Sequence, residues 1–258
     1  MQITKPLALN EVGGRENNED AIFPQGNEAN ATNRFFLVCD GMGGHECGEI
    51  ASNSVCESFA LSLKNICPDD FDESAFEHVL NLAFDRLDEK DNNSETAKKM
   101  GTTLAFLYLN NKQAFMAHIG DSRIYHLRKT DNNEVRILYQ SSDHSYINEL
   151  VKAEVITEAE AANHPKKNVI TRAIYPHLQK RCKADIHITT DVMAGDRFFL
   201  CSDGITESVT NEHLCAIASE YSDDEVMMNA ILTQCEKYSR DNFSAWLISI
   251  VEGVQRRD

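Results

Sequence analysis

Short apolar runs that repeat every second residue alternate along the chain with segments whose apolar residues recur every three or four positions. The first pattern is typical of β-strands and the second of amphipathic helices. Neighbouring strand segments are often separated by gaps of hairpin length, which favours an α+β sandwich over a repeat of parallel βαβ units. Strands are predicted at 3–12, 34–39, 102–109, 112–119, 122–128, 134–139, 184–190, 196–201 and 243–250.

Three segments have apolar stripes with helical spacing, and the first of them follows directly on a glycine-rich loop. The chain contains no Pro/Ser-rich linker and no low-complexity tract, so we predict a single domain over residues 1–258. The stripes are Ala51, Val55, Phe59 and Leu63; Phe76, Val79, Leu80, Ala83, Phe84 and Leu87; and Val226, Met227, Ala230, Ile231 and Tyr238.

One internal repetition is more informative than the other patterns. Residues 34–42 (RFFLVCDGM) and 197–205 (RFFLCSDGI) each form an apolar run that leads into Asp-Gly. A strand that is apolar on both faces is typical of the centre of a sheet, so its terminal aspartate is expected at the rim of the core. The following glycine would let the backbone turn sharply and present its carbonyl group to a ligand. The two segments therefore predict one shared site that is supplied by two strands.

The charge balance excludes several classes of partner. The 258 residues include 25 basic and 41 acidic side chains, a formal net charge of −16, and such a surface repels nucleic acid and anionic membranes. No apolar stretch approaches the roughly 20 residues of a spanning helix, and the N-terminus does not resemble a signal peptide. Eight scattered cysteines without a CxxC pair fit reduced thiols, so we predict a cytoplasmic protein without membrane insertion.

The candidate chemistry lies in a set of short acidic motifs, almost all of which adjoin a predicted strand. A single Asp-Gly is usually an ordinary turn. Several carboxylates gathered at one end of a sandwich would repel one another unless cations bridge them. Oxygen donors without a Cys/His cluster select hard cations, and the absence of a D-x-D-x-D-G run favours Mg²⁺ or Mn²⁺ over Ca²⁺. The motifs are Asn18-Glu19-Asp20, Asp40-Gly41, Gly120-Asp121-Ser122-Arg123, Asp203-Gly204 and Asp241-Asn242.

Eight motifs, taken together and in order, give the chain a resemblance to the PPM family, also called the protein phosphatase 2C class, in its bacterial form. The resemblance covers nearly the whole chain. It implies a central β-sandwich of two antiparallel sheets flanked by helix pairs, with metal ions in a cleft at one end. The motifs are GGRENNED (13–20), CDGMGGHECGEIAS (39–52), MGTTLAFLYL (100–109), HIGDSRIYHLR (118–128), SSDHSYINELV (141–151), NVITRAI (168–174), GDRFFLCSDGITESV (195–209) and RDNFSAWLISI (240–250).

The resemblance also implies which residues bind the metal ions, namely two tightly bound Mg²⁺ or Mn²⁺ and a third that is held more weakly. Asp40 would bridge the two principal ions, with the Gly41 carbonyl group as a further ligand. Asp20 would engage one of them directly or through water. The remaining ligands are Asp203 and Asp241 for the other principal ion, and Asp121 together with Asp203 for the third. The alternative for Asp121 is that it only stabilises its turn, paired with Arg123.

The implied activity is that of a phosphoprotein phosphatase, which hydrolyses phosphoserine and phosphothreonine by direct attack of a metal-bridging hydroxide. Its substrates would be targets of a Ser/Thr kinase. Arg15 would bind the substrate phosphate. His45 is a candidate acid for the leaving group, although it could equally cap the helix that starts near residue 46. Residues 142–174 resemble the family's flap segment beside the active site.

Three other functions remain open. The protein could be a catalytically silent binding module, a hydrolase of another phosphate ester, or a regulator that acts on one dedicated phosphoprotein. Among the remaining polar residues, Thr102 and Thr103 are expected to hydrogen-bond the backbone of a metal ligand. His118 and His144 are expected in the core or behind the metal ligands, and Lys166-Lys167 in a solvated loop.

Overall fold

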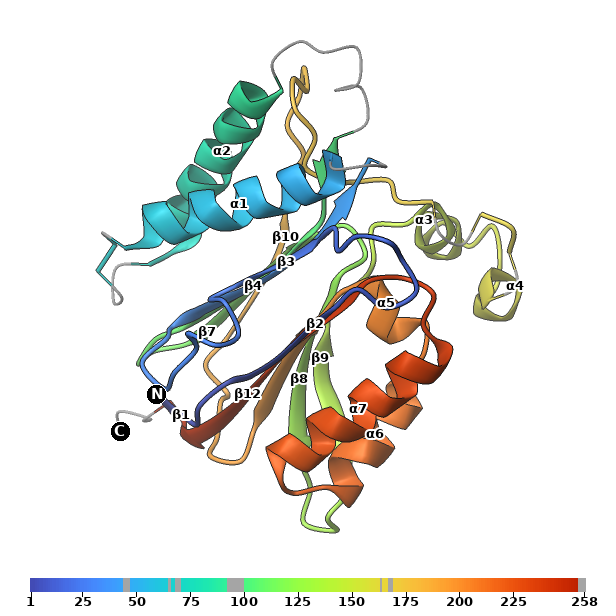
Figure 1. Cartoon of the computed structure of the whole chain (residues 1–258). Helices are drawn as coiled ribbons and strands as arrows, with labels where there is room; N and C mark the ends of the chain where they lie inside the picture. Colours follow the sequence, from blue (N-terminus) through green and yellow to red (C-terminus); the bar gives the residue numbers. More distant parts are fainter. Residues whose placement is uncertain are drawn as a thin grey trace.

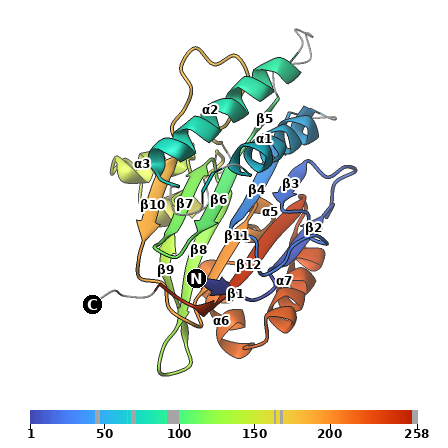
Figure 2. The same ribbon diagram turned by 90° about the vertical axis from the view of Figure 1, so that its left-hand side faces the viewer.

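The computed structural model shows two antiparallel β-sheets packed face to face, with helices covering their outer faces (Figures 1 and 2). This arrangement is the predicted α+β sandwich. All eight cysteines are free, and among the described helices none is long and apolar enough to cross a membrane. The structure describes residues 1–43, 47–64, 66–67, 71–91, 100–162, 164–166 and 169–254.

The first sheet has the strand order β1-β12-β11-β8-β9, and β2 also pairs with β12. Its central strand β11 carries the apolar run that leads to Asp203, and β12 and β8 flank it on both sides. The strands of this sheet are β1 (Gln2–Ile3), β2 (Leu7–Glu11), β8 (Arg123–Lys129), β9 (Val135–Gln140), β11 (Arg197–Cys201) and β12 (Phe243–Glu252).

The second sheet has the order β10-β7-β6-β4-β3, and β5 pairs with the end of β4. Here β4 carries the apolar run that leads to Asp40, and it lies between β6 and β3. The two repeated segments are thus interior strands of opposite sheets. The strands of the second sheet are β3 (Asp20–Phe23), β4 (Phe35–Met42), β5 (Gly101–Thr102), β6 (Leu104–Leu109), β7 (Ala114–Ile119) and β10 (Asp185–Thr189).

The two sheets are joined by a core of fully buried side chains that both of them supply. Phe36 of β4 packs against Trp246 of β12, with ring centroids 5.4 Å apart. The Trp246 indole N–H donates a hydrogen bond of 3.2 Å to the Leu37 carbonyl oxygen, which satisfies a polar group that would be costly to bury unpaired. These contacts fix the position of β4 in one sheet relative to β12 in the other.

Helix pairs cover the outer faces. The buried residues of α2 are the predicted stripe, and Asp72 caps the helix by accepting a 2.8 Å hydrogen bond from the Ala75 N–H. The α7 stripe was only partly correct, because Met227, Met228, Ile231 and Cys235 face the sheet whereas Val226 and Tyr238 are exposed. On the second sheet lie α1 (Cys47–Leu63) and α2 (Glu73–Lys90); on the first, α6 (Asn211–Glu220) and α7 (Asp224–Tyr238); and at one end α3 (Tyr146–Lys152), α4 (Glu158–Ala162) and the short α5 (Asp203–Thr206).

Several strand predictions were wrong in detail. The segment 3–12 forms two strands, with Pro6 in the gap between them, where a residue without an N–H cannot donate to the sheet. The segment 102–109 divides into β5 and β6, and β3 was not predicted. The segments 112–119 and 122–128 are not a hairpin, because β7 belongs to the second sheet and β8 to the first. The connection that carries Asp121 therefore crosses from one sheet to the other.

Candidate active site

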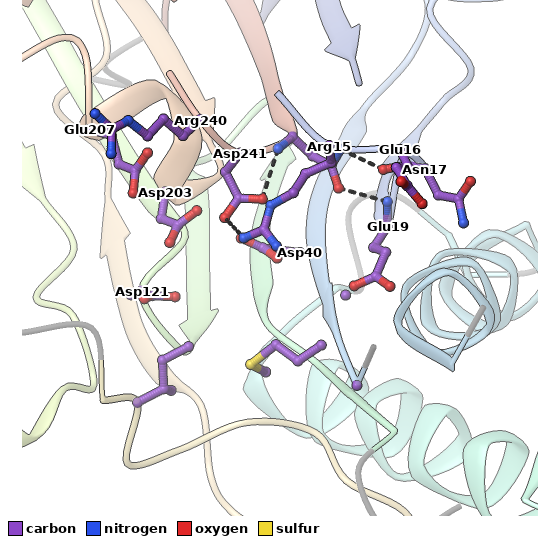
Figure 3. A pocket seen from close by; sticks show the side chains of 15 residues that line it. Arg15, Glu16, Asn17, Glu19, Asp40, Asp121, Asp203, Glu207, Arg240 and Asp241 are labelled. Carbon is purple, nitrogen blue, oxygen red and sulfur yellow. Dashed lines mark hydrogen bonds and ion pairs between the residues drawn. The ribbon is translucent and has the colours of Figure 1, made fainter. Parts of the chain in front are cut away.

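The predicted acidic motifs converge on an open cavity of about 630 Å³ at the end of the sandwich (Figure 3). Four of the five candidate metal-binding aspartates line it, together with Gly41 and Arg15. The described lining residues are Arg15, Glu16, Asn17, Glu19, Asp40, Gly41, Met42, Gly43, Asp121, Ile170, Asp203, Glu207, Arg240, Asp241 and Asn242.

Asp40 and Asp203 enter the cavity from opposite sheets. Asp40 lies within β4, which continues to Met42, and Asp203 is the first residue of α5, directly after β11 and Ser202. The expectation that both strands stop at Asp-Gly with a sharp turn was therefore wrong. The expectation of one shared site supplied by two strands is confirmed, because both carboxylates line the same cavity.

The glycines after these two aspartates allow close packing and do not serve as turns. A Cβ atom on Gly41 would lie 2.2 Å from the Gly48 carbonyl oxygen and 2.4 Å from that of Glu19. A Cβ on Gly204 would lie 2.0 Å from the Asn242 carbonyl oxygen. Any side chain at either position would push apart two segments that form the cavity wall.

The backbone of Asp40 is held by two threonines. The Asp40 N–H donates to Thr103 Oγ1 at 2.9 Å, and Thr102 Oγ1 donates to the Asp40 carbonyl oxygen at 3.0 Å. Both threonines are fully buried, so these bonds are shielded from competing water. The predicted hydrogen bonds from these threonines are therefore present, and they hold the backbone of Asp40.

Asp121 lies on the connection from β7 to β8. Its Oδ1 atom is buried and has no hydrogen-bond partner within the described residues. The alternative in which Asp121 pairs with Arg123 is wrong, because Arg123 donates to both carboxylate oxygens of Asp143, each at 2.7 Å. The Asp121 Oδ1 atom is thus left for another partner in the cavity.

Arg15 and Asp241, which both line the cavity, form an ion pair with Arg15 Nη2 2.6 Å from Asp241 Oδ2. The Arg15 side chain is 58% exposed, so this pair contributes little to stability. The loop that carries Arg15 is anchored by Asn242, whose Nδ2 donates to the carbonyl oxygens of Val12 and Asn17 at 2.7 and 2.8 Å. Asn242 also accepts the Glu19 N–H at 2.9 Å, an anchoring role that the sequence pattern did not predict.

Asp20 occupies a different position from the other aspartates. It is 5% exposed and is not among the described residues that line the cavity. Its Oδ2 accepts a 2.7 Å hydrogen bond from Ser202 Oγ, and Ser202 Oγ accepts the Ser244 N–H at 2.9 Å. Asp20 therefore lies behind the cavity wall, where it joins β3 of one sheet to the end of β11 in the other.

Burial and mutual repulsion dominate the electrostatics of the site. Burial raises the pKa of Asp20 and of Asp121 to about 7, and that of Asp203 to about 6. The pKa of Asp40 is raised well above its usual range, first by burial and then by the charges of neighbouring aspartates. A group of carboxyls with raised pKa values attracts protons or cations near neutral pH.

Two predicted residues lie outside the described part of the chain, His45 and Lys167. Lys166 is exposed, and its Nζ lies 5.3 Å from the centroid of the Tyr146 ring, as expected for a loop residue. Glu207 and Arg240 line the cavity but were not predicted. Both residues lie within quoted motifs, Arg240 at the start of 240–250 and Glu207 in 195–209, but no role was assigned to either of them.

Comparison with known proteins connects this geometry to a family. Residues 13–248 match the family Protein phosphatase 2C. The protein phosphatase PhpP of Streptococcus pneumoniae is 34% identical over 209 residues, which are 80% of each chain. The serine/threonine protein phosphatase PstP of Mycobacterium tuberculosis is 31% identical over 207 residues, which are 77% of this chain and 35% of that longer protein.

Solved structures agree with the fold. The crystal structure of the M. tuberculosis serine/threonine phosphatase PstP/Ppp superposes with a TM-score of 0.83 at 25% identity, covering 98% of this chain and all of the other. The structure of the PstP catalytic domain in complex with two manganese ions gives a TM-score of 0.79 at 24% identity, covering 98% of this chain and all of that one. The family match and the identity to PhpP over most of both chains show that this chain belongs to the protein phosphatase 2C family.

Proposed function

We propose that this protein is a metal-dependent phosphoprotein phosphatase that hydrolyses phosphoserine and phosphothreonine. The observation that carries the proposal is the convergence of Asp40, Asp121, Asp203 and Asp241 on one open cavity beside Arg15. The relatives support the same activity, because PhpP is named a protein phosphatase and PstP a serine/threonine protein phosphatase.

The residues of the cavity fit divalent cations. The buried Oδ1 atoms of Asp121 and Asp203 have no hydrogen-bond partner within the described residues, and the clustered carboxyls have raised pKa values. A bound cation would give the unpartnered oxygens a partner and would offset the repulsion between the carboxylates. The aspartates offer only oxygen, the donor that Mg²⁺ and Mn²⁺ prefer. The related PstP catalytic domain was solved with two manganese ions, which supports the same class of metal here.

Asp40 and the Gly41 carbonyl group would hold the two principal ions, with Asp203 and Asp241 completing the second. Asp121 would hold a third ion together with Asp203. The position of Asp20 behind the cavity wall favours contact through water over direct ligation. When bound, the ions would lower the pKa of water and offset the negative charge of the phosphate.

Arg15 is the residue that we assign to the substrate phosphate. Its guanidinium group lines the cavity, and the ion pair with Asp241 involves only one of its nitrogens, Nη2. A guanidinium group carries five N–H donors in a planar fork, so it can still offer two parallel bonds to phosphate oxygens. His45 remains a candidate for protonating the leaving oxygen.

The flap, the class of substrate and the cellular location are also part of the proposal. We assign residues 142–174, which carry α3 and α4, to a flap beside the cavity that Ile170 helps to line. The formal charge of −16 favours phosphoproteins over nucleic acids as substrates. The eight free thiols support a cytoplasmic location, where a Ser/Thr kinase would supply the phosphorylated targets.

Metal removal tests the proposal directly. Activity on phosphoserine peptides should be lost in EDTA and should return with Mn²⁺ or Mg²⁺, whereas Zn²⁺ should restore little. Asp203→Asn should lower kcat by about 100-fold or more, because it removes a charged ligand shared by two of the ions. Glu207→Gln, at a lining residue without an assigned role, is the matched control and should change kcat by less than about threefold. A folded Asp203→Asn enzyme with near wild-type turnover contradicts the metal assignment.

Thermal unfolding in EDTA tests the buried charge of Asp121. The pKa of this group is about 7 in the folded protein and near 3.9 when unfolded, so the folded state loses stability as the pH rises from about 4 to about 7, and the loss is complete above that range. Asp121→Asn should therefore raise Tm over wild type by about 2–4 °C at pH 8, which corresponds to about 1 kcal/mol. The gain should vanish near pH 4. The neutral buried histidines His118 and His144 act in the opposite direction, but equally in both proteins. An equal Tm difference at both pH values contradicts the prediction.

Arg15→Ala should chiefly raise KM for phosphopeptides, by about tenfold, because it removes a phosphate contact that already exists in the bound substrate. Arg15→Lys should raise KM less than Arg15→Ala does, because lysine keeps the positive charge but cannot form two parallel bonds to the phosphate. Steady-state kinetics on one phosphothreonine peptide measures both parameters. A fall in kcat with unchanged KM would mean that Arg15 acts only on the transition state.

Asp121→Ala should separate the third ion from the two principal ions. Calorimetric titration should still show two tightly bound Mn²⁺, while kcat for phosphopeptides falls by about 10–100-fold. Small aryl phosphates should lose less, because their leaving groups need less protonation. Unchanged phosphopeptide turnover would show that Asp121 holds no catalytically important ion. Equal losses on both substrates would show that the third ion does not act on the leaving group.

A further inference from the structure

A buried histidine outside the cavity contacts the loop that carries Asp121. His144 Nδ1 accepts the Gly120 N–H at 3.1 Å, and the His144 N–H donates to the Gly120 carbonyl oxygen at 2.9 Å. Both backbone polar groups of the residue before Asp121 are thus bonded to a single residue. His144 is 3% exposed, so water does not compete for these bonds.

The other side of the same imidazole faces β10 and the end of the flap. His144 Nε2 lies 3.2 Å from Asp185 Oδ2, and Arg172 Nη1 donates to Asp185 Oδ1 at 2.8 Å. The His144 carbonyl oxygen accepts the Thr171 N–H at 2.8 Å. Because Nδ1 faces an N–H group it must be unprotonated, so the ring proton is on Nε2 and points to Asp185.

His118, His144 and Asp185 bring their donor atoms within 4.8 Å of one another, as a metal site would. The ring geometry argues against a chelate. The two imidazole rings are stacked, with centroids 4.5 Å apart and planes inclined by 14°. Their in-plane lone pairs therefore run side by side and do not converge on one ion. Moreover, His144 Nδ1 is already used by Gly120, and the guanidinium of Arg172 lies beside Nε2.

The loop of Asp121 is also held on its far side. Ser122 Oγ lies 2.6 Å from Thr103 Oγ1, the same atom that accepts the Asp40 N–H. Gly120 has a φ of +99°, and a Cβ there would lie 2.6 Å from Thr103 Cγ2, so the loop is pressed against this threonine. Asp121 thus sits between two fixed neighbours, one bonded to His144 and one to Thr103.

From this arrangement we infer that His144 is a positioning residue, which sets the Asp121 carboxylate for the third cation by holding Gly120 through Nδ1. The inference rests on the proposed function, because it assigns a role towards the metal held by Asp121. The contacts that join His144 through Asp185 and Arg172 to the flap are expected to contribute less to the position of Asp121. A partner that orients a metal ligand typically contributes 10–100-fold to metal affinity or activity.

Two substitutions at His144 separate the two sides of the ring. In His144→Asn the amide oxygen stands where Nδ1 stood and can still accept the Gly120 N–H, but the contact with Asp185 is lost. In His144→Gln the amide reaches towards Asp185, and the acceptor for Gly120 is lost. Asp185→Asn is the matched control, since it weakens the far contact and leaves His144 in place. Each variant is checked by thermal unfolding.

The first measurement is amide hydrogen exchange of Gly120 in the protein without metal, which needs no catalysis. His144→Gln should speed this exchange by about tenfold or more, whereas His144→Asn and Asp185→Asn should stay close to wild type. The second is the Mn²⁺ concentration for half-maximal phosphopeptide hydrolysis. It should rise by about tenfold in His144→Gln and by less than about threefold in the other two variants.

Equal effects of Asn and Gln in either measurement overturn the inference, as does unchanged Gly120 exchange in His144→Gln. Should His144→Gln not fold, His144→Asn decides alone, because a tenfold higher Mn²⁺ requirement in that variant is incompatible with positioning through Nδ1. If the wild-type protein has no phosphatase activity the proposed function fails, and the exchange measurement still tests the contact to Gly120.

Discussion

The concentration of negative charge at one end of the sandwich is the constraint on which the rest of this structure depends. Asp40, Asp121, Asp203 and Asp241 share one cavity, and burial raises the pKa of the first three. Bringing carboxylates together in a partly desolvated site costs free energy that hydrophobic packing elsewhere must offset. The interior strands β4 and β11, most of whose residues are buried, hold this unfavourable arrangement in place.

The two-sheet architecture explains how the charges can be held close without collapsing onto one another. Asp40 comes from one sheet and Asp203 from the other, so their separation is set by side chains of the core such as Phe36 and Trp246. The Ser202–Asp20 hydrogen bond joins the sheets again behind the cavity. A cation placed between the sheets therefore meets ligands whose spacing is fixed by the whole core and not by a flexible loop.

Much of the site could be predicted from sequence, because its candidate residues lie in short contiguous motifs and their residue types indicate the chemistry. The apolar runs before Asp40 and Asp203 identified interior strands, and the acidic set predicted one shared site. What failed depended on contacts between residues far apart in the chain. No local pattern shows that β7 and β8 belong to different sheets, and none shows that Gly204 abuts the Asn242 carbonyl group.

The same limit applies to the residues that hold the ligands. Asn242 fixes the Arg15 loop through three hydrogen bonds, yet in sequence it is only the polar neighbour of Asp241. Thr103 is more telling, because one hydroxyl oxygen contacts both the Asp40 N–H and Ser122 Oγ. A shift of this side chain must move the backbone beside two metal-ligand candidates at once. Asp40 and Asp121 are far apart in the sequence, yet their positions are coupled through Thr103. The distance between the two aspartates therefore depends on the position of the Thr103 side chain.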